Sequence, residues 1–520
     1  ADGSLIIAVD CGITNVAEIK HALDLWIVSC VVDHRDPHDA LPPAVAIVNP
    51  KVGDDYPFDG LCACALCGKV RQAIAFGETD LFGQPVTLVN ARPANDTIIV
   101  DAVHIENGVE VDRVSEALVP GVASLETSRL YGFLVGHTLI GYDAALQTQL
   151  LSRGLGSNVE VHVGDLAEHI AELFPQLAGR SLLELRERSK LARYNDSPPE
   201  EIDVLVALYR VAIDERFPQV REAIESVLDL IALATLADMA PVIDENRTLV
   251  RLGVDRLNSN PNPGIGAVLV AAKLKKRTIT SRDVGWLVTP MINATGRMGE
   301  PSRAVELLLS DDESERVAIA EAVLSMNKDR RDKSDSAWQL IQSKISASLE
   351  RHQNKLIAVY EPGLHRGVTG IIAGRLSRRY NVPAAVLTAV NDTAVGSVRS
   401  ARGFVATDFL SRFEDIFERW GGHDEAAGFN IRLEHLDRFW RRLDEVVPGV
   451  ELDADGEKEL EIDAELPPKY LNQNLEEVVN RFEPYGQSNP ALVFLARNMV
   501  LDDLKIIGKD EDHLRLTLDG

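Results

Sequence analysis

The chain has 520 residues, of which 45% are hydrophobic and 26% are charged, and this composition excludes a disordered or low-complexity protein. Its formal net charge of −26 excludes a uniformly basic surface, so a nucleic acid would have to bind in a local basic groove. Five cysteines in so long a chain argue against a disulfide framework. No apolar run has the length of a membrane-spanning helix, and we expect a cytoplasmic protein without a membrane partner.

The N-terminal region predicts two parallel strands that end in polar side chains. An apolar stretch over residues 5–13 carries Asp10 near its end, and residues 15–25 are typical of a helix. A second strand over residues 26–32 leads directly into the segment Asp33-His34-Arg35. Because open α/β sheets place their sites at the carboxyl ends of their strands, we expect these polar residues to form part of a site.

A third apolar stretch, residues 229–239, repeats this arrangement with Asp238 at its end, and we interpret it as another strand. Asp10, His34 and Asp238 together offer carboxylate and imidazole ligands that suit Mn²⁺ or Mg²⁺. Hydrolysis of a phosphodiester uses one or two such ions. The alternative interpretation is that each residue only caps a helix or closes a turn.

The C-terminal half predicts two further domains behind a helical connection. Residues 300–352 are typical of one or two long polar helices, with Ser310-Asp311-Asp312-Glu313 as the N-terminal cap. A second α/β domain begins near residue 353, and from about residue 450 short strands and turns predict a small β-barrel. The strands expected in these two regions are residues 356–360, 384–387, 395–398, 459–462, 492–495, 504–507 and 514–518.

A second group of candidate residues lies in the domain that begins near residue 353. We interpret Gly421-Gly422-His423 as a turn that opens a small-residue helix, where backbone N–H groups and an imidazole could approach a phosphate. Upstream, Arg399 and Ser400 offer a guanidinium and a hydroxyl that suit phosphate contact. The alternative interpretation of the glycines is an ordinary tight turn.

These motifs, in this order, resemble the DHH phosphoesterase superfamily and, within it, the RecJ-like single-strand-specific DNA exonucleases. The resemblance implies two α/β lobes joined by a long helix, followed by an OB-like β-barrel. The implied domains are a DHH phosphoesterase domain (1–86 and 214–299, with its N-terminal part expected before residue 1), the connecting helix (300–352), a DHH-associated substrate-binding domain (353–447) and an incomplete OB-like nucleic-acid-binding domain (448–520). The motifs that carry the resemblance are Asp10-Cys11-Gly12-Ile13, Asp33-His34-Arg35-Asp36-Pro37, Ala234-Thr235-Leu236-Ala237-Asp238, Ile292-Asn293-Ala294-Thr295-Gly296-Arg297, Gly421-Gly422-His423 and Pro484-Tyr485-Gly486-Gln487-Ser488-Asn489-Pro490.

The activity that this resemblance implies is metal-dependent 5′→3′ hydrolysis of single-stranded DNA, in DNA repair or recombination. Two Mn²⁺ or Mg²⁺ ions are expected, with Asp10, His34 and Asp238 as ligands. Arg35 is expected to act in the same catalytic site by holding the scissile or a neighbouring phosphate. The residues expected to hold substrate phosphates are Arg297, Arg399, Ser400, Gly421, Gly422 and His423.

Two departures from the family pattern affect this expectation. The family's Asp-x-Asp metal motif is expected upstream of residue 1, and the signature Asp-His-His is replaced by Asp33-His34-Arg35 here. Arginine cannot bind a cation, but it binds phosphate well. A catalytically inactive RecJ-like scaffold of a replication or repair complex is therefore the alternative hypothesis.

Residues 87–213 do not follow the RecJ pattern and resemble a DnaQ-like exonuclease domain. The acidic pair of that family is replaced by Asn90-Ala91-Arg92, and Pro198 occupies the position of its histidine. Only Asp143 and Asp203 remain, and two carboxylates should not hold two cations. We predict a non-catalytic α/β insertion that contacts nucleic acid or other replication or repair proteins.

Overall fold

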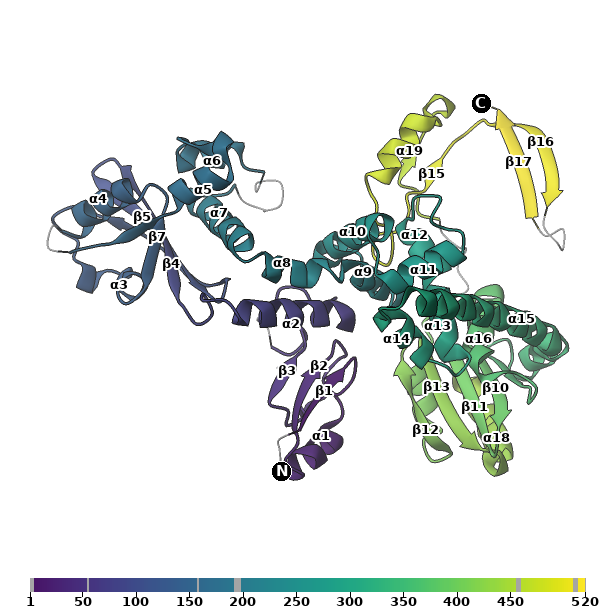
Figure 1. Ribbon diagram of the computed structural model, residues 1–520. Coiled ribbons are helices and arrows are strands. Elements are labelled where there is room, and N and C mark those ends of the chain that lie inside the picture. Colours follow the sequence, from purple (N-terminus) through teal and green to yellow (C-terminus); the bar gives the residue numbers. More distant parts are fainter. Residues whose placement is uncertain are drawn as a thin grey trace. The chain divides into compact units, whose positions relative to one another are not determined.

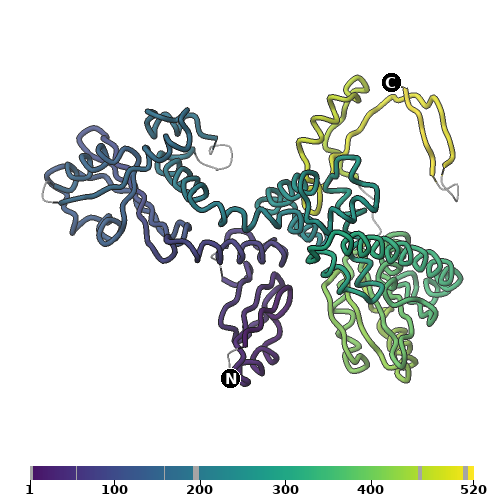
Figure 2. Tube along the Cα trace, in the orientation of Figure 1, coloured from purple at the N-terminus to yellow at the C-terminus, as the bar shows by residue number. Residues whose placement is uncertain are grey.

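The computed structural model describes residues 4–53, 56–156, 159–190, 198–454, 460–507 and 513–519 (Figures 1 and 2). Its contacts divide the chain into two compact units. Unit 1 is Ala1–Asn49 with Ala65–Val227, and unit 2 is Pro50–Cys64 with Leu228–Gly520. Within the described residues, no helix is long and apolar enough to cross a membrane.

Unit 1 begins with a small parallel sheet whose strand ends carry the candidate site. The strands are β1 (Leu5–Val9), β2 (Val28–Val32) and β3 (Ala46–Val48), in that order, and α1 (Val16–Asp24) connects the first two. The two predicted strands and the predicted helix are therefore present. Between β1 and α1 the chain turns at Gly12, where φ is +113° and a Cβ would lie within 3.1–3.2 Å of Ala8 and Val31, so glycine is needed there.

The rest of unit 1 is dominated by a five-stranded sheet inserted between two helices. Its strand order is β6-β5-β4-β7-β8, with β5 antiparallel to β4 and β6, and with β7 parallel to β4 and β8. The elements are α2 (Ala63–Gly77), β4 (Val86–Ala94), β5 (Thr97–Glu106), β6 (Val109–Leu118), α3 (Tyr131–Leu134), β7 (Thr138–Gly141), α4 (Ala144–Leu155), β8 (Val163–Asp165), α5 (Leu166–Leu173), α6 (Leu182–Arg188), α7 (Glu201–Arg216) and α8 (Pro218–Glu225).

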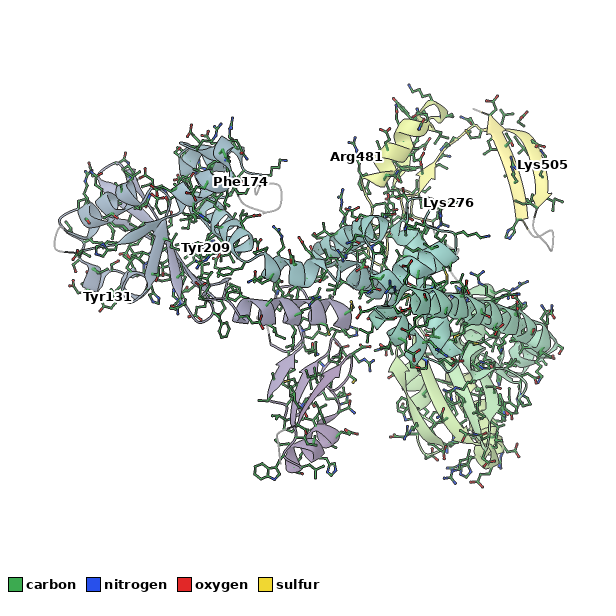
Figure 3. The ribbon with its side chains drawn as sticks, in the orientation of Figure 1. Tyr131, Phe174, Tyr209, Lys276, Arg481 and Lys505 are labelled. Atoms are coloured by element: carbon green, nitrogen blue, oxygen red, sulfur yellow. The ribbon has the colours of Figure 1, made fainter. Side chains whose placement is uncertain are left out.

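Two apolar clusters hold helices on the two faces of this sheet. One cluster contains side chains of α4, and the other contains side chains of α5, α6 and α7, including Tyr209, with Phe174 packed against it (Figure 3). The β5–β6 hairpin turns at Asn107 and Gly108, both with positive φ, as is typical of a two-residue hairpin loop. The segment enters after α2 and returns to α8, and Arg71 on α2 donates a 2.8 Å hydrogen bond to the Ser226 hydroxyl.

From Leu228 onwards, unit 2 begins with a helical region. Residues 229–239, which we interpreted as a strand, form most of helix α9 and the turn that follows it, so this prediction is wrong. The stretch is rich in leucine and alanine, which favour helix, and its apolar residues are not confined to one face, so it lacks the periodicity that separates helix from strand. The helices are α9 (Leu228–Ala237), α10 (Asp244–Ser259), α11 (Pro263–Ala271), α12 (Ser281–Asp283), a π-helical turn (Val284–Val288), α13 (Thr289–Arg297), α14 (Ser302–Leu309) and α15 (Glu313–Arg351).

The long helix α15 confirms the predicted helical connection. The Asp312 carboxylate caps it by accepting a 2.8 Å hydrogen bond from the Glu315 N–H, within the predicted cap segment. Apolar residues of its first half, such as Val323, pack against the helical region. Apolar residues of its second half, such as Trp338 and Ile341, pack against the α/β domain that follows.

The second α/β domain of unit 2 is a five-stranded sheet of order β12-β13-β11-β10-β9. Helices α15 and α16 cover one face, and α17 and α18 cover the other with a core rich in phenylalanine. The three strands predicted here from the sequence are confirmed. The elements are β9 (Ile357–Tyr360), α16 (Thr369–Tyr380), β10 (Ala384–Val390), β11 (Thr393–Arg399), α17 (Ala406–Ser411), β12 (Phe417–His423), β13 (Ala426–Arg432) and α18 (Leu436–Val446).

The described C-terminal residues form two separate two-stranded sheets. The parallel pair is β14 (Ala464–Glu465) with β15 (Phe494–Leu495), and the antiparallel pair is β16 (Val500–Ile507) with β17 (His513–Asp519). Helix α19 (Gln473–Asn480) lies between β14 and β15 in the sequence, and Figure 3 shows Lys505 on β16. Of the predicted strand 459–462, Glu459 lies outside the described residues and residues 460–462 are not a strand.

Candidate functional site

The ends of β1 and β2 bring an aspartate and a histidine into contact. Asp10 follows β1 with a φ of 59°, an uncommon conformation for a non-glycine residue, and its N–H donates to the Val32 carbonyl at 3.0 Å. His34 follows β2, and its Nε2 lies 3.1 Å from Asp10 Oδ1. The parallel register, in which Val9 pairs with Val32, explains why two residues 24 positions apart meet at this edge.

Asp33 is a third member of this site, and the sequence did not lead us to name it as a metal ligand. Its fully buried carboxylate accepts backbone N–H groups of Ile13 at 3.1 Å, His34 at 2.8 Å and Arg35 at 3.2 Å, and so shapes both loops. One ligand atom each of Asp10, Asp33 and His34 lies within 4.8 Å of the others. The available signal was its place as the first polar residue after β2.

This donor set fits a divalent cation. Two carboxylates and one imidazole suit Mn²⁺ or Mg²⁺, and an ionised carboxylate has about four lone-pair positions, so Asp33 retains acceptor capacity beyond its three backbone bonds. Among the described residues, this is the one group of three such side chains close enough to share an ion.

Arg35 places a positive charge beside the same carboxylate. A guanidinium nitrogen lies 4.0 Å from Asp10 Oδ1, with 49% of the Arg35 side chain and 55% of the Asp10 side chain exposed. The backbone is held by Asn49, whose side chain donates to the Arg35 carbonyl at 2.9 Å. An exposed guanidinium at this position can bind an anion that approaches the site.

The third predicted metal ligand, Asp238, lies in unit 2. It directly follows helix α9 and not a strand, it is exposed, and its N–H donates to the Ala234 carbonyl at 2.9 Å. The negative end of the helix dipole at this position favours a cation. The structure thus brings Asp10 and His34 together with Asp33 and Arg35 in unit 1, while Asp238 is part of the other unit.

Arg297 and Arg399 form a separate basic group within unit 2. Arg297 ends α13 and donates to the Gly367 carbonyl at 3.5 Å. Arg399 ends β11 and lies against Gly370 in the first turn of α16, where a Cβ would be 2.8 Å from its guanidinium. Burial lowers the pKa of both guanidinium groups, and the neighbouring charges of Arg297 and Arg378 lower the pKa of Arg399 further. In the described part of the chain no carboxylate pairs with Arg297 or Arg399, so this group is suited to an anion.

The segment Gly421-Gly422-His423 is part of edge strand β12 and does not open a helix, so that prediction is wrong. The turn is Asp424-Glu425, and the following small residues form β13. Alternation of buried and less buried residues along 426–432 has the period of a strand, and Gly421 pairs with Gly428 across the hairpin. Cradling of a phosphate by a helix N-terminus therefore does not apply at these glycines.

The register of the sheet nevertheless places the imidazole and the guanidinium on one face. His423 pairs with Ala426, and Ala426 pairs on its other side with Arg399, so the three side chains lie on one face of the sheet. Only the small Ala426 side chain lies between His423 and Arg399. Ser400 serves the local loop: its hydroxyl donates to the Phe404 carbonyl and its N–H to the Glu425 carbonyl.

In the inserted sheet, the positions that the sequence analysis associated with a second nuclease site are occupied by internal pairs. Arg92 forms an ion pair with the buried Asp101. Asp203 pairs with Arg113 at 2.7 Å. Asp143 caps α4 by accepting the Leu146 N–H at 3.2 Å. These carboxylates are used within the fold.

The chain matches three protein-family models in separate segments. Residues 2–101 match the DHH family N-terminal domain, residues 353–448 match the DHHA1 domain, and residues 462–520 match the RecJ OB domain.

Curated relatives and a solved structure share this pattern. The single-stranded-DNA-specific exonuclease RecJ of Bacillus subtilis is 30% identical over 300 residues, which are 56% of this chain and 37% of that protein. The protein of the same name from Escherichia coli is 29% identical over 302 residues, with 56% and 52% covered. The chain thus spans about half the length, or less, of these relatives. The structure of RecJ in complex with Mn²⁺ from Thermus thermophilus is similar, with a TM-score of 0.61 and 22% sequence identity. The match includes 99% of this chain and 55% of the Thermus thermophilus chain, and it supports the fold.

Proposed function

Because the chain carries a DHH family N-terminal domain, a DHHA1 domain and a RecJ OB domain in this order, we propose that it hydrolyses single-stranded DNA from the 5′ end in a metal-dependent reaction of DNA repair or recombination. The observation that carries the proposal is the convergence of Asp10, Asp33 and His34 within the segment that matches the DHH family. RecJ relatives that resemble this chain are named single-stranded-DNA-specific exonucleases.

The proposed cofactors are two divalent cations, either Mn²⁺ or Mg²⁺. One ion would be held by Asp10, Asp33 and His34, and Asp238 is the proposed ligand from unit 2. A divalent cation supplies Lewis-acid activation of water and neutralises charge on the phosphate. The 3.1 Å separation of His34 Nε2 and Asp10 Oδ1 places both atoms where they can face one ion, and Asp33 fixes the loop through its backbone hydrogen bonds.

Hydrolysis forms a bond between a water oxygen and phosphorus and breaks the bond to the leaving nucleotide oxygen, so negative charge increases on the phosphate. Arg35, Arg297, Arg399 and His423 are the proposed phosphate-binding side chains. Arginine suits this role because its planar guanidinium donates two parallel hydrogen bonds to phosphate oxygens. The absence of carboxylate partners for Arg297 and Arg399 among the described residues supports it.

A second candidate function is that of a catalytically inactive scaffold in a replication or repair complex. The observation that favours it is the Arg35 guanidinium beside Asp10, because its charge opposes a nearby cation. In either case, the inserted sheet is proposed to bind partner proteins or nucleic acid. The proposed location is the cytoplasm. All five cysteines lie within the described residues and are free thiols, as is usual for a protein in a reducing compartment.

The decisive experiment uses the full chain with single strands labelled at the 5′ or the 3′ end and with a matching duplex. With Mn²⁺ or Mg²⁺ we expect mononucleotides to be released first from the 5′ end of the single strand only. Chelation of the metal and the Asp10→Ala change should each stop the reaction. If the chain binds the single strand but does not hydrolyse it with either Mn²⁺ or Mg²⁺, the result would support the scaffold function and contradict the exonuclease function.

A further inference from the structure

Unit 2 contains a cleft of about 790 Å³ whose lining combines an aromatic surface, cations and amides. Its walls come from the end of α9, the α12–α13 segment, α15, α16 and residues 479–491. The side chains that matter here are Trp286, Asn293, Arg297, Arg330, Asn480 and Gln487.

Trp286 is presented to solvent by a rigid support. It lies in the π-helical turn Val284–Val288, and π-helical turns within helices are frequently found at functional sites. Val284 and Val288 at the two ends of the turn are fully buried, whereas 76% of Trp286 is exposed. A large aromatic side chain that is exposed on an anchored turn offers a flat face for stacking, at little conformational cost.

The opposite wall is held in place by hydrogen bonds to the helical region. Glu483 accepts from the Ser281 hydroxyl at 2.8 Å, and that hydroxyl accepts from the Tyr485 N–H at 2.9 Å. The Val242 N–H donates to the Gln487 carbonyl at 2.7 Å. These bonds attach residues 483–487 to the helical region and use the Glu483 carboxylate as an acceptor within this wall.

The cations of the cleft favour a polyanionic occupant. Arg297 and Arg330 both line it, and burial together with the charges of Arg331 and Arg297 lowers the pKa of Arg330. Arg330 donates to the Asn327 side chain at 3.2 Å, and no carboxylate within the described residues forms an ion pair with it. An aromatic face beside unneutralised arginines fits a single-stranded nucleic acid, in which bases stack and phosphates carry charge.

We propose that Trp286 is the base-stacking residue of this cleft: one nucleobase of a single strand stacks on its indole, while Arg297 and Arg330 bind the adjacent phosphates. The identity of the strand rests on the proposed function. The amides of Asn293, Asn480 and Gln487 lie where they can contact base edges. Trp286 is thus a positioning residue that sets how the strand lies.

The test measures the affinity of the full chain for a fluorescein-labelled single strand of 12 thymidines, in chelator so that nothing is hydrolysed. Trp286→Ala should weaken binding by about 5- to 100-fold, the loss typical of one stacked base, and Trp286→Phe should recover most of it. Trp26→Ala is the matched control, because Trp26 is 86% exposed in unit 1 and should leave affinity unchanged.

Strands with a single abasic position distinguish stacking from a general structural effect. When the missing base is the one that stacks on Trp286, the affinity of the unaltered chain should fall by the same factor as the Trp286→Ala change causes. The affinity of the Trp286→Ala variant should not fall further with that strand. Unchanged affinity in Trp286→Ala, or equal abasic losses in both proteins, would overturn the inference. Tight, Trp286-dependent binding without any metal-dependent hydrolysis would contradict the proposed exonuclease while the stacking role stands.

Discussion

The Arg35 guanidinium lies 4.0 Å from the same Asp10 oxygen that contacts His34 at 3.1 Å. Replacement of Arg35 by histidine removes a permanent charge and most of five fixed donors from this edge. We expect weaker binding of single strands, a smaller dependence of affinity on salt, and a higher kcat with Mn²⁺, because binding energy used on the ground state does not lower the barrier. If Arg35→His changes neither the affinity for single strands nor the rate of hydrolysis, Arg35 does not contact the phosphate and is an ordinary surface residue.

Asp33 should be needed for metal binding. Asp33→Asn keeps one acceptor oxygen but removes the negative charge, so the affinity for Mn²⁺ should fall by at least about 10- to 100-fold. Titration of the full chain with Mn²⁺ by calorimetry measures this effect without any substrate. Asp39→Asn, a change at an exposed residue of the same loop, is the control. Equal Mn²⁺ affinity in Asp33→Asn and the control would show that Asp33 is only a structural acceptor.

Asp238 should be needed for hydrolysis and not for folding. It is exposed beyond the end of α9, so Asp238→Ala should leave the circular dichroism spectrum and thermal unfolding unchanged while abolishing degradation of single strands. Rates with Mn²⁺ and with Mg²⁺ should be compared with those of the unaltered chain. Full Mn²⁺-dependent degradation by the variant would remove Asp238 from the site.

The inserted sheet should have no nuclease activity of its own. In an Asp10→Ala background, a strand with a blocked 5′ end and a free 3′ end should remain intact with Mn²⁺ or Mg²⁺. The reason is that Asp101, Asp143 and Asp203 are used in an ion pair, a helix cap and another ion pair. Degradation from the 3′ end that stops on Asp143→Ala would show that this domain is active.

Gly422 and Gly421 should differ sharply in their tolerance of a methyl group. Gly422 has a φ of +151°, and a Cβ there would overlap the Ala426 carbonyl oxygen across the hairpin. Gly422→Ala should therefore lower the free energy of unfolding of this domain by about 1–3 kcal/mol. A Cβ at Gly421 meets nothing within 4 Å, so Gly421→Ala should cost much less. Equal unfolding midpoints in denaturant for the two variants would contradict this interpretation of the hairpin.

The parts of the site that follow from local sequence were predictable. An apolar run that ends in a carboxylate and a glycine is a strand leading into a turn, and this placed Asp10 and His34 at one sheet edge. Asp33 was placed at this edge but not named as a ligand, and the contact of its buried carboxylate with the backbone is a role that residue type alone does not reveal. In a run such as 229–239 the apolar residues are not confined to one face, so the run carries no clear periodicity, and helix and strand then look alike.

Long-range pairing explains the remaining differences. Whether Gly421-Gly422-His423 begins a helix or ends a strand depends on its pairing with Ala426–Gly428 and on the neighbouring strand β11. The approach of Arg297 to Arg399 depends on Gly367 and Gly370, which allow α13 and β11 to lie close to the segment that begins α16. Such contacts involve residues far apart in the chain, so short motifs do not encode them singly.

The hydrogen bond from Arg71 to Ser226 joins α2, which precedes the inserted sheet, to the end of α8, which follows it. A domain whose two ends meet adds little loop-closure entropy to its host, however long it is. Such a module can therefore be gained, lost or exchanged with little effect on the fold of the rest of the chain. A short turn joining α2 to α8 should give a smaller chain in which the strand-end site persists.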